Sequence, residues 1–156
     1  MDISSSAEFA AEPERVYAMM IDRDYLEQVC VASHASAYDV SVAGAKTKTS
    51  RTLESPATAA KFTGPQLTVV EEVTWGPAAH DGSRVGDMRL TVSGQPVALN
   101  GTMTISPGGP GSVLQLTGQL KVSIPLLGRK LEESAAPAVL AGFKTHRKVG
   151  ADWLAG

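Results

Sequence analysis

The middle of the chain, from about residue 36 to residue 122, alternates apolar and polar residues with a period of two. Successive side chains of a strand point to opposite faces, so this pattern predicts strands with one apolar and one polar face. Six such runs follow one another, and Gly- or Pro-containing turns separate them. Strands joined in this way pair antiparallel. We therefore expect a meander with one face on a core and the other in water.

Helical spacing appears on both sides of this meander. Residues 3–11 predict a weakly patterned first strand, and two short helices follow it. Pro13 suits the first position of one helix, and Asp22 suits the N-cap of the next. After the meander, residues 127–154 predict one long amphipathic helix. Pro137 lies inside this helix and is expected to kink it or to begin its regular part.

One arc of the long helix, about 100° wide, carries its apolar residues. The arc contains Leu131, Ala135, Ala138, Val139, Gly142, His146, Val149 and Trp153. This face is expected to lie against the sheet. The elements together predict an α+β helix-grip arrangement, in which a curved antiparallel sheet of about seven strands wraps around the C-terminal helix. Two short helices stand between strands 1 and 2.

Composition limits the classes of protein that this chain can belong to. Hydrophobic residues make up 43% of the 156 residues, which is enough for a sizeable core, and no linker divides them. We expect residues 1–156 to form a single domain. The net charge of −2 is spread along the chain, which argues against a nucleic-acid or anionic-membrane surface. The oligomeric state stays open.

The expected location is the cytoplasm. Cys30 is the one cysteine, so no internal disulfide can form, as suits a reducing compartment. The first residues after Met1 are polar or acidic and do not resemble a secretory signal. No apolar run approaches the roughly 20 residues that span a bilayer, so we expect no integral membrane association.

Three segments resemble a known superfamily. Residues 14–26 read ERVYAMMIDRDYL, residues 71–75 read EEVTW, and residues 124–132 read IPLLGRKLE. In this order of elements they resemble the START-like helix-grip superfamily, which includes polyketide cyclases, pollen-allergen-type ligand binders and lipid-transfer domains. Over nearly the whole chain they are similar to a bacterial family called domain of unknown function 2505. The resemblance implies a hydrophobic cavity between sheet and helix, and it names neither a ligand nor a catalytic residue.

His146 is the most informative polar residue, because it lies near the centre of the apolar arc. It is either a core histidine hydrogen-bonded to a strand or a polar group inside a ligand cavity. Ala135, Ala138 and Gly142 favour the cavity, since a helix that closes a solid core would carry Leu or Ile there. Small residues also suit close contact between helix and sheet, so both interpretations remain open.

Glu71 and Arg51 form a second candidate. Glu71 shares a strand face with Val69 and Val73, and if that face is inward the carboxylate needs a partner. Arg51 is the nearest cation if the two strands are neighbours. Val70 gives the opposite face an apolar residue as well, so an outward Glu71 is equally compatible with the pattern.

No motif for nucleophilic, phosphate-binding or metal chemistry is present. His34 and His80 have no neighbours at the spacing of a zinc site, and Cys30 is best explained as a buried thiol. The chain contains neither a Gly-x-Ser-x-Gly nor a Gly-x-Gly-x-x-Gly segment. We therefore expect no cofactor and assign no catalytic residue.

The leading hypothesis is that the chain binds a small hydrophobic molecule, a lipid or a polyketide-like compound, in this internal cavity. The expected ligand-binding residues are His146, Trp75, Met88, Leu90, Met103, Leu116, Leu120, Gly142, Tyr38, Arg51 and Glu71.

Two alternatives stay open. One is a cyclase- or dehydratase-type enzyme that uses the same cavity, with His146, Glu71, Tyr17 or Tyr38 as the titratable group. The other is an interaction module without a ligand, which a filled interior would favour.

Overall fold

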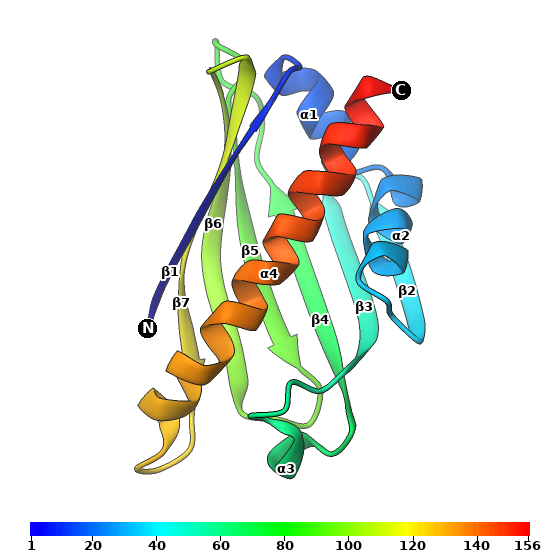
Figure 1. The fold of residues 1–156 in the computed structure, drawn as a ribbon. Coiled ribbons are helices and arrows are strands. Elements are labelled where there is room, and N and C mark those ends of the chain that lie inside the picture. The colour runs from blue at the N-terminus through cyan, green and yellow to red at the C-terminus, as the bar shows by residue number, and fades with distance from the viewer.

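The computed structural model describes residues 1–156 and contains seven strands and four helices (Figure 1). The strands are β1 (Asp2–Phe9), β2 (Ala37–Ala43), β3 (Lys46–Glu54), β4 (Gln66–Trp75), β5 (Arg84–Val92), β6 (Val97–Gly108) and β7 (Gly111–Val122). The helices are α1 (Pro13–Met20), α2 (Arg23–Ala32), α3 (Ala60–Thr63) and α4 (Gly128–Ala155). The predicted α+β order of elements is confirmed, and α3 is the one element that the sequence did not predict.

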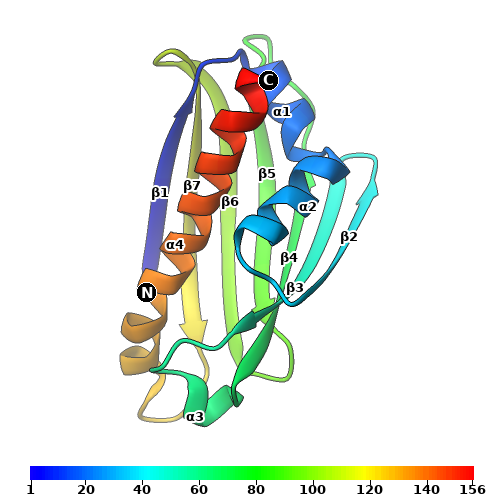
Figure 2. The same ribbon diagram turned by 45° about the vertical axis from the view of Figure 1, so that its right-hand side comes forward.

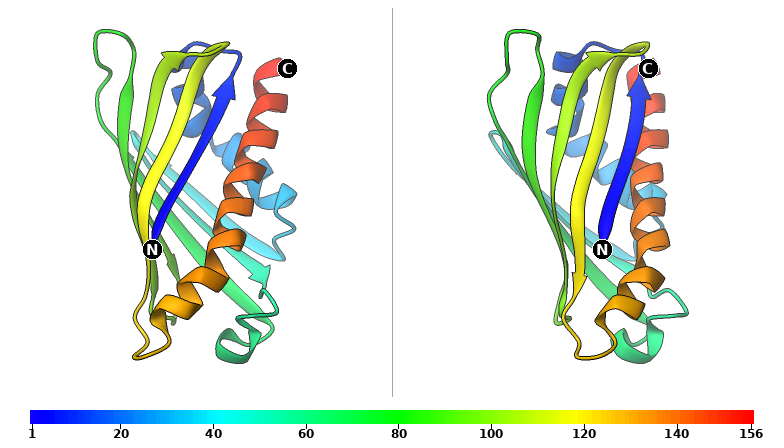
Figure 3. Two further views of the ribbon diagram at one scale, coloured as in Figure 1. Left: turned by 60° about the vertical axis from the view of Figure 1, so that its left-hand side comes forward. Right: turned by 90° about the vertical axis from the view of Figure 1, so that its left-hand side faces the viewer.

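All seven strands form one antiparallel sheet in the order β1-β7-β6-β5-β4-β3-β2. The meander predicted from the alternation runs from β2 to β7, and β1 pairs with the free edge of β7. Figures 1 and 2 show α4 lying diagonally across the concave face of this sheet. In the side views of Figure 3, α4 forms a second layer together with α1 and α2.

Two glycines allow β6 and β7 to approach each other closely. Gly101 and Gly118 are partners in the register of these strands. A Cβ on Gly101 would lie 2.5 Å from the carbonyl oxygen of Thr117, and one on Gly118 would lie 2.8 Å from that of Asn100. Any side chain would push the strands apart at this point. Glycine in a strand interior marks such close approaches and bends, which fits the curvature of the sheet here.

The ends of the short helices follow from local chemistry. Pro13 opens α1, as predicted. Asp22 caps α2, since its carboxylate accepts from the backbone N–H groups of Asp24 at 2.8 Å and Tyr25 at 3.2 Å. Both helices are too short to be stable alone and bury an apolar face, with Val16 and Tyr25 completely inaccessible.

Pro137 does not break the long helix, which is continuous from Gly128 to Ala155. The proline cannot donate to the carbonyl of Glu133, four residues earlier, and its ring crowds that carbonyl. Both residues are exposed, so water can satisfy the free carbonyl. The structure thus shows a tolerated proline rather than the start of the helix.

The buried face of α4 is rotated from the predicted arc. His146 is buried as expected, but Ala136 and Gly150, which lie outside the arc, are buried too. Ala138, inside the arc, is exposed. The prediction from the helical wheel is wrong for Ala138 because it assumes that the whole apolar arc contacts other protein atoms. In the structure, one flank of α4 faces open space.

Two glycines of α4 have opposite surroundings. A Cβ on Gly150 would lie 2.9 Å from the ring of Phe9 and 3.1 Å from the methyl carbon of Met19. A Cβ on Gly142 would meet nothing within 4 Å. Both explanations for small residues on this helix therefore hold, at different positions: close packing at Gly150 and empty space at Gly142.

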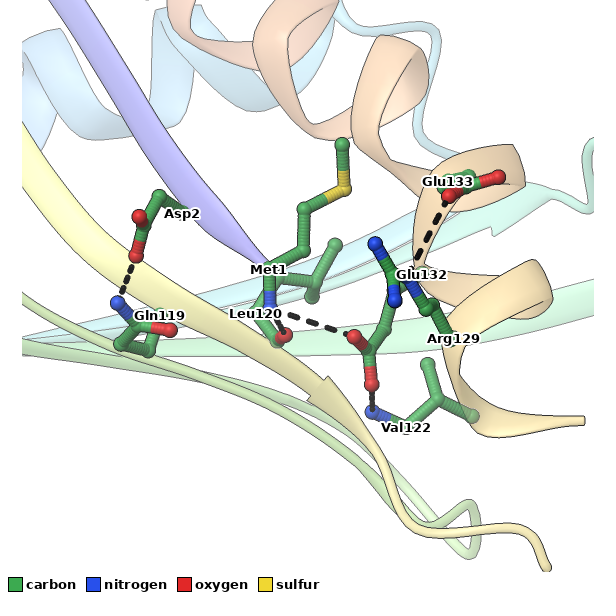
Figure 4. Close-up of polar contacts among 8 residues, drawn as sticks. All are labelled: Met1, Asp2, Gln119, Leu120, Val122, Arg129, Glu132 and Glu133. Carbon is green, nitrogen blue, oxygen red and sulfur yellow. Dashed lines mark hydrogen bonds and ion pairs between the residues drawn. The ribbon is translucent and has the colours of Figure 1, made fainter. Parts of the chain in front are cut away.

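Glu132 fixes the first turns of α4 to the sheet (Figure 4). Its carboxylate accepts from the backbone N–H of Val122 at 3.0 Å and lies 3.2 Å from the amino group of Met1. That amino group also donates to the carbonyl of Leu120 at 2.8 Å. The backbone N–H of Val122 is the main cause that lowers the pKa of Glu132. These contacts join β1, β7 and α4 at one end of the sheet.

The contrast between the two glycines can be tested with matched substitutions. Gly142→Ala is expected to stabilise the protein by about 0.5–1 kcal/mol, because alanine favours the helix and its methyl group meets no atom. Gly150→Ala is expected to destabilise it by about 1–3 kcal/mol, because the methyl group overlaps Phe9. Urea unfolding measures both values. Equal effects of the two substitutions would show that the helix does not lie as described.

Candidate ligand-binding site

A cavity of about 510 Å³ lies between the concave face of the sheet and one flank of α4. Cavities that bind small molecules have volumes of this order. The sheet contributes mainly aliphatic side chains to the wall, namely Leu53, Leu67, Val69, Leu90 and Val92. The helix contributes smaller residues, among them Ser134, Ala135, Ala138, Ala141 and Gly142. Because these side chains are short, α4 covers the sheet here without filling the space beneath it.

Arg51 and Glu71 both point to the concave face, and each is 6% exposed. In the register of β3 and β4, Arg51 lies opposite Val69 and Glu71 opposite Thr49, so the two are diagonal neighbours. Nη1 of Arg51 is 3.8 Å from Oε2 of Glu71. The structure therefore decides the orientation that the pattern left open: Glu71 points inward and Arg51 pairs with it.

His146 reaches the same carboxylate from α4. Its Nε2 lies 3.6 Å from Oε2 of Glu71, and its side chain is 9% exposed. Tyr25 on α2 holds it from the other side. The Tyr25 hydroxyl donates to the backbone carbonyl of His146 at 2.9 Å and lies 3.4 Å from Nδ1. Arg51, Glu71 and His146 are called the charge cluster below.

The charge cluster keeps Glu71 ionised. Burial alone raises the pKa of Glu71, but the adjacent His146 and Arg51 side chains outweigh burial and lower this pKa from 4.5 to about 2. Because the folded pKa lies below the unfolded one, the ionised carboxylate contributes stability above about pH 4.5. That contribution is lost as the pH falls through about 2. Burial, and then the charge of Glu71, raise the pKa of Tyr25, so its hydroxyl keeps the proton that it donates.

The cluster has more donors than acceptors. Nε and Nη1 of Arg51 and Nε2 of His146 are buried and have no hydrogen-bond partner within range. A buried donor without an acceptor is costly, and most such groups in proteins are satisfied. Arg51 and His146 also line the cavity. The three nitrogens themselves have no accessible surface, so other atoms of these two side chains form the cavity wall.

The expected ligand-binding residues divide into three sets. Four of them line the large cavity: Arg51, Leu90, Gly142 and His146. Met103 and Leu116 line a separate space of about 20 Å³ beside His146. The remainder lie elsewhere: Met88, Leu120, Trp75 and Glu71 are buried in or beside the core, and Tyr38 is 43% exposed on β2.

Two aromatic candidates have other structural roles. The rings of Trp75 and Tyr17 pack edge to face with their centroids 5.9 Å apart, and the guanidinium of Arg84 lies 3.7 Å over Tyr17. Neither ring lines the large cavity. Of the titratable groups named for an enzyme, this leaves His146 and Glu71 in contact with each other beside the cavity.

Several site residues were not found from the sequence. Tyr25 was placed on the apolar face of a short helix. The only feature that could have marked it as a site residue is its hydroxyl, because a buried tyrosine needs a hydrogen-bond partner. Phe62 belongs to α3 and lines the cavity with 40% of its surface exposed. Leu53 and Leu67 come from strands that the pattern predicted, but nothing in the pattern marks them as cavity residues.

Nothing in the structure suggests a metal centre or a membrane-spanning helix. No group of three or more His, Cys, Asp or Glu side chains is placed to hold a metal ion. No helix is both long and apolar enough to cross a membrane.

An antiparallel sheet that wraps a long C-terminal helix is the architecture of the START-like helix-grip proteins. The family model described as "Protein of unknown function (DUF2505)" matches residues 4–154, so the chain belongs to this family. The resemblance found in the sequence is thereby confirmed. No curated protein matches the chain.

Solved structures show the same fold. TTHA0849 from Thermus thermophilus has a TM-score of 0.66 and 19% identity, over 97% of this chain and 95% of the other. A STAR-related lipid transfer protein from Xanthomonas axonopodis has a TM-score of 0.66 and 14% identity, over 99% and 86%. A START superfamily protein from Mycobacterium smegmatis has a TM-score of 0.61 and 16% identity, over 98% of both chains. At these identities the likeness concerns the fold.

The charge cluster can be tested by unfolding. Arg51→Met is expected to cost about 3–5 kcal/mol, because Glu71 then loses a cation while it stays buried. The double variant Arg51→Met with Glu71→Leu is expected to recover much of that loss, since apolar side chains replace the charge and its partner. Urea unfolding at neutral pH measures both.

The control lies on the other face of the same two strands. Lys48 and Glu72 are 3.5 Å apart, and both side chains are more than a third exposed. Lys48→Met is expected to change stability by at most about 1 kcal/mol. If Arg51→Met costs no more than this control, Arg51 and Glu71 are not a buried pair.

Proposed function

We propose that this protein binds a small hydrophobic molecule, a lipid or a polyketide-like compound, in the cavity between the sheet and α4. The observation that carries the proposal is the cavity of about 510 Å³ with its aliphatic wall. A ligand replaces water on this apolar surface, which is favourable at roughly 25 cal/mol for each Å². The charge cluster supplies the few polar groups that orient a guest in such sites.

The space beneath α4 separates this proposal from the ligand-free interaction module. A module of that kind is expected to have a filled interior, with large side chains on α4. Instead, an added Cβ at Gly142 would meet no atom within 4 Å. Part of the wall is open to solvent, since Ala138 and Phe62 are exposed, so water can fill the space and a ligand would displace that water from an apolar surface.

The fold supports the same conclusion. One solved structure with this fold is a STAR-related lipid transfer protein, as its name states. That name describes the relative. Here it adds a reason to test lipid-like molecules first.

The test is titration with N-phenyl-1-naphthylamine, an uncharged dye that fluoresces in apolar surroundings. We expect saturable binding at one site with a dissociation constant of about 1 μM, which corresponds to about −8 kcal/mol. Gly142→Leu is expected to weaken binding by about tenfold or more, because the new side chain occupies the cavity. Its folding stability is expected to stay equal to that of the wild type or to rise.

The matched control is Ala151→Leu, at an exposed position of the same helix. It adds a similar apolar side chain outside the cavity and is expected to leave the affinity unchanged. If the dye fails to bind, or if both variants bind it as the wild type does, the cavity is not a ligand site.

A further inference from the structure

Three large apolar side chains are exposed at one end of the fold. In the loop between β7 and α4, Leu126 is fully exposed and Leu127 is 43% exposed, and Phe62 on α3 is 40% exposed. Figures 1, 2 and 3 show α3 and this loop at the same end of the molecule. Single exposed apolar residues are ordinary on protein surfaces, whereas several at one place mark a binding surface. These three side chains are called the apolar tip below.

The apolar tip stands beside an opening of the large cavity. The turn between β5 and β6 connects its two segments: the N–H of Ser123 donates to the carbonyl of Pro96 at 2.8 Å. The side-chain nitrogen of Gln95 lies 3.5 Å from the carbonyl oxygen of Phe62. Phe62 and Ile124 both line the cavity. Because Phe62 is at once part of the wall and exposed, the cavity meets the surface here.

The backbone of Leu126 makes its exposure costly. Its φ is 67°, in the left-handed region that leucine rarely adopts and that glycine and asparagine tolerate. Its side chain has no cover from the rest of the molecule. Neither the backbone nor packing within the fold therefore favours leucine at this position. A leucine gains free energy here only when it leaves water for another apolar phase.

Exposed basic residues surround the apolar tip. Residues 55–65 and 121–131, which contain it, carry four basic residues and no acidic one. These are Lys61, Lys121, Arg129 and Lys130, and all four are exposed. The chain as a whole has 14 basic and 16 acidic residues, so positive charge is concentrated at this end. The even spread of charge along the sequence is not kept here, because two distant segments meet in the fold.

The neighbouring acidic residues only partly offset these charges. Glu132 lies 3.2 Å from the amino group of Met1, which balances it. Glu133 lies 3.8 Å from Arg129, and Glu54 is exposed at the edge of the cavity. Four basic residues thus stand against two acidic ones, which leaves an excess of positive charge beside the apolar tip.

A lipid bilayer fits this surface better than a second protein. A stable protein interface buries about 800 Å² on each partner, and three separate projecting side chains do not provide such a face. A bilayer needs no matching shape: leucine and phenylalanine enter its interface while basic side chains contact anionic headgroups. It is also an apolar phase from which a molecule of low water solubility can reach the cavity.

We propose that the apolar tip docks on a lipid bilayer that carries anionic lipids, with the opening of the cavity toward that bilayer. This proposal adds a partner to the proposed function, and the opening gives the docked molecule its orientation. Leu126 and Leu127 enter the bilayer, and Lys61 and Lys130 lie at the level of the headgroups.

The test is sedimentation of the protein with large unilamellar vesicles, without the dye. One set consists of phosphatidylcholine alone, and the other contains about a quarter phosphatidylglycerol. We expect binding to the anionic vesicles to be about tenfold stronger or more, and to weaken as the salt concentration rises.

Leu126→Asn separates insertion from attraction between charges. It is expected to weaken binding to the anionic vesicles by about tenfold, because a leucine no longer enters the bilayer. Its folding stability is expected to equal or exceed that of the wild type, since asparagine tolerates the left-handed backbone. The matched control is Val85→Thr, which removes an apolar group that is 53% exposed on β5 and outside the apolar tip. It is expected to leave vesicle binding unchanged.

A second pair of variants tests the basic residues. Lys130→Gln is expected to weaken binding to the anionic vesicles by about fivefold, because one cation near the headgroups is lost. The control is Lys148→Gln, an exposed lysine of the same helix, about 27 Å farther along its axis. This control is expected to have no effect.

The outcomes decide the docking independently of the cavity. The proposal is overturned by a wild type that binds neither kind of vesicle or both equally. It is also overturned if Leu126→Asn binds as the wild type does, or if Lys148→Gln weakens binding as much as Lys130→Gln. A protein that binds the dye but no vesicle refutes the docking alone. A protein that binds vesicles through Leu126 but no dye refutes the ligand cavity alone.

Discussion

The contact of His146 with Glu71 is the interaction on which the open interior depends. α4 packs against β1 and β7 and against α1 and α2. Over β4 the contact is polar: Nε2 of His146 lies 3.6 Å from the Glu71 carboxylate. Charged groups can hold two elements at a fixed distance without filling the space between them. A cluster of leucines would draw the helix onto the sheet and close the cavity.

The folding stability of this arrangement is lower than that of a solid apolar core. Buried ion pairs are often no more stabilising than well-packed apolar side chains of the same volume. The cluster here also leaves donors of Arg51 without acceptors, and the helix beside it carries alanine and glycine. The proposed function would require such an arrangement, because an apolar wall and a few polar side chains must both be in place before a ligand arrives.

The fold could be predicted from the sequence because apolar residues recur with a period of about 2 in the strands and about 3.6 in the helices. The site was only partly predictable. The strand of Glu71 has valines on both faces, so its orientation depends on pairing with β3 and on the position of α4, which no local pattern contains. Tyr25 and His146 are 121 residues apart, and their hydrogen bond arises only when α2 and α4 meet. The helical wheel placed Gly142 inside the apolar arc and Gly150 outside it, and only the packing of α4 shows that Gly142 faces space while Gly150 faces a phenylalanine ring.

The central claim is that Glu71 is an ionised carboxylate held inside the protein beside Arg51 and His146. Carbon-13 NMR of the Glu71 side-chain carboxyl carbon, followed from pH 7 to the acid limit of folding, tests it most directly. The account predicts that Glu71 stays ionised well below the ordinary value of 4.5, with a pKa of about 2. A carboxyl group that takes up its proton at pH 4.5 or above would contradict the account, because burial would then outweigh Arg51 and His146.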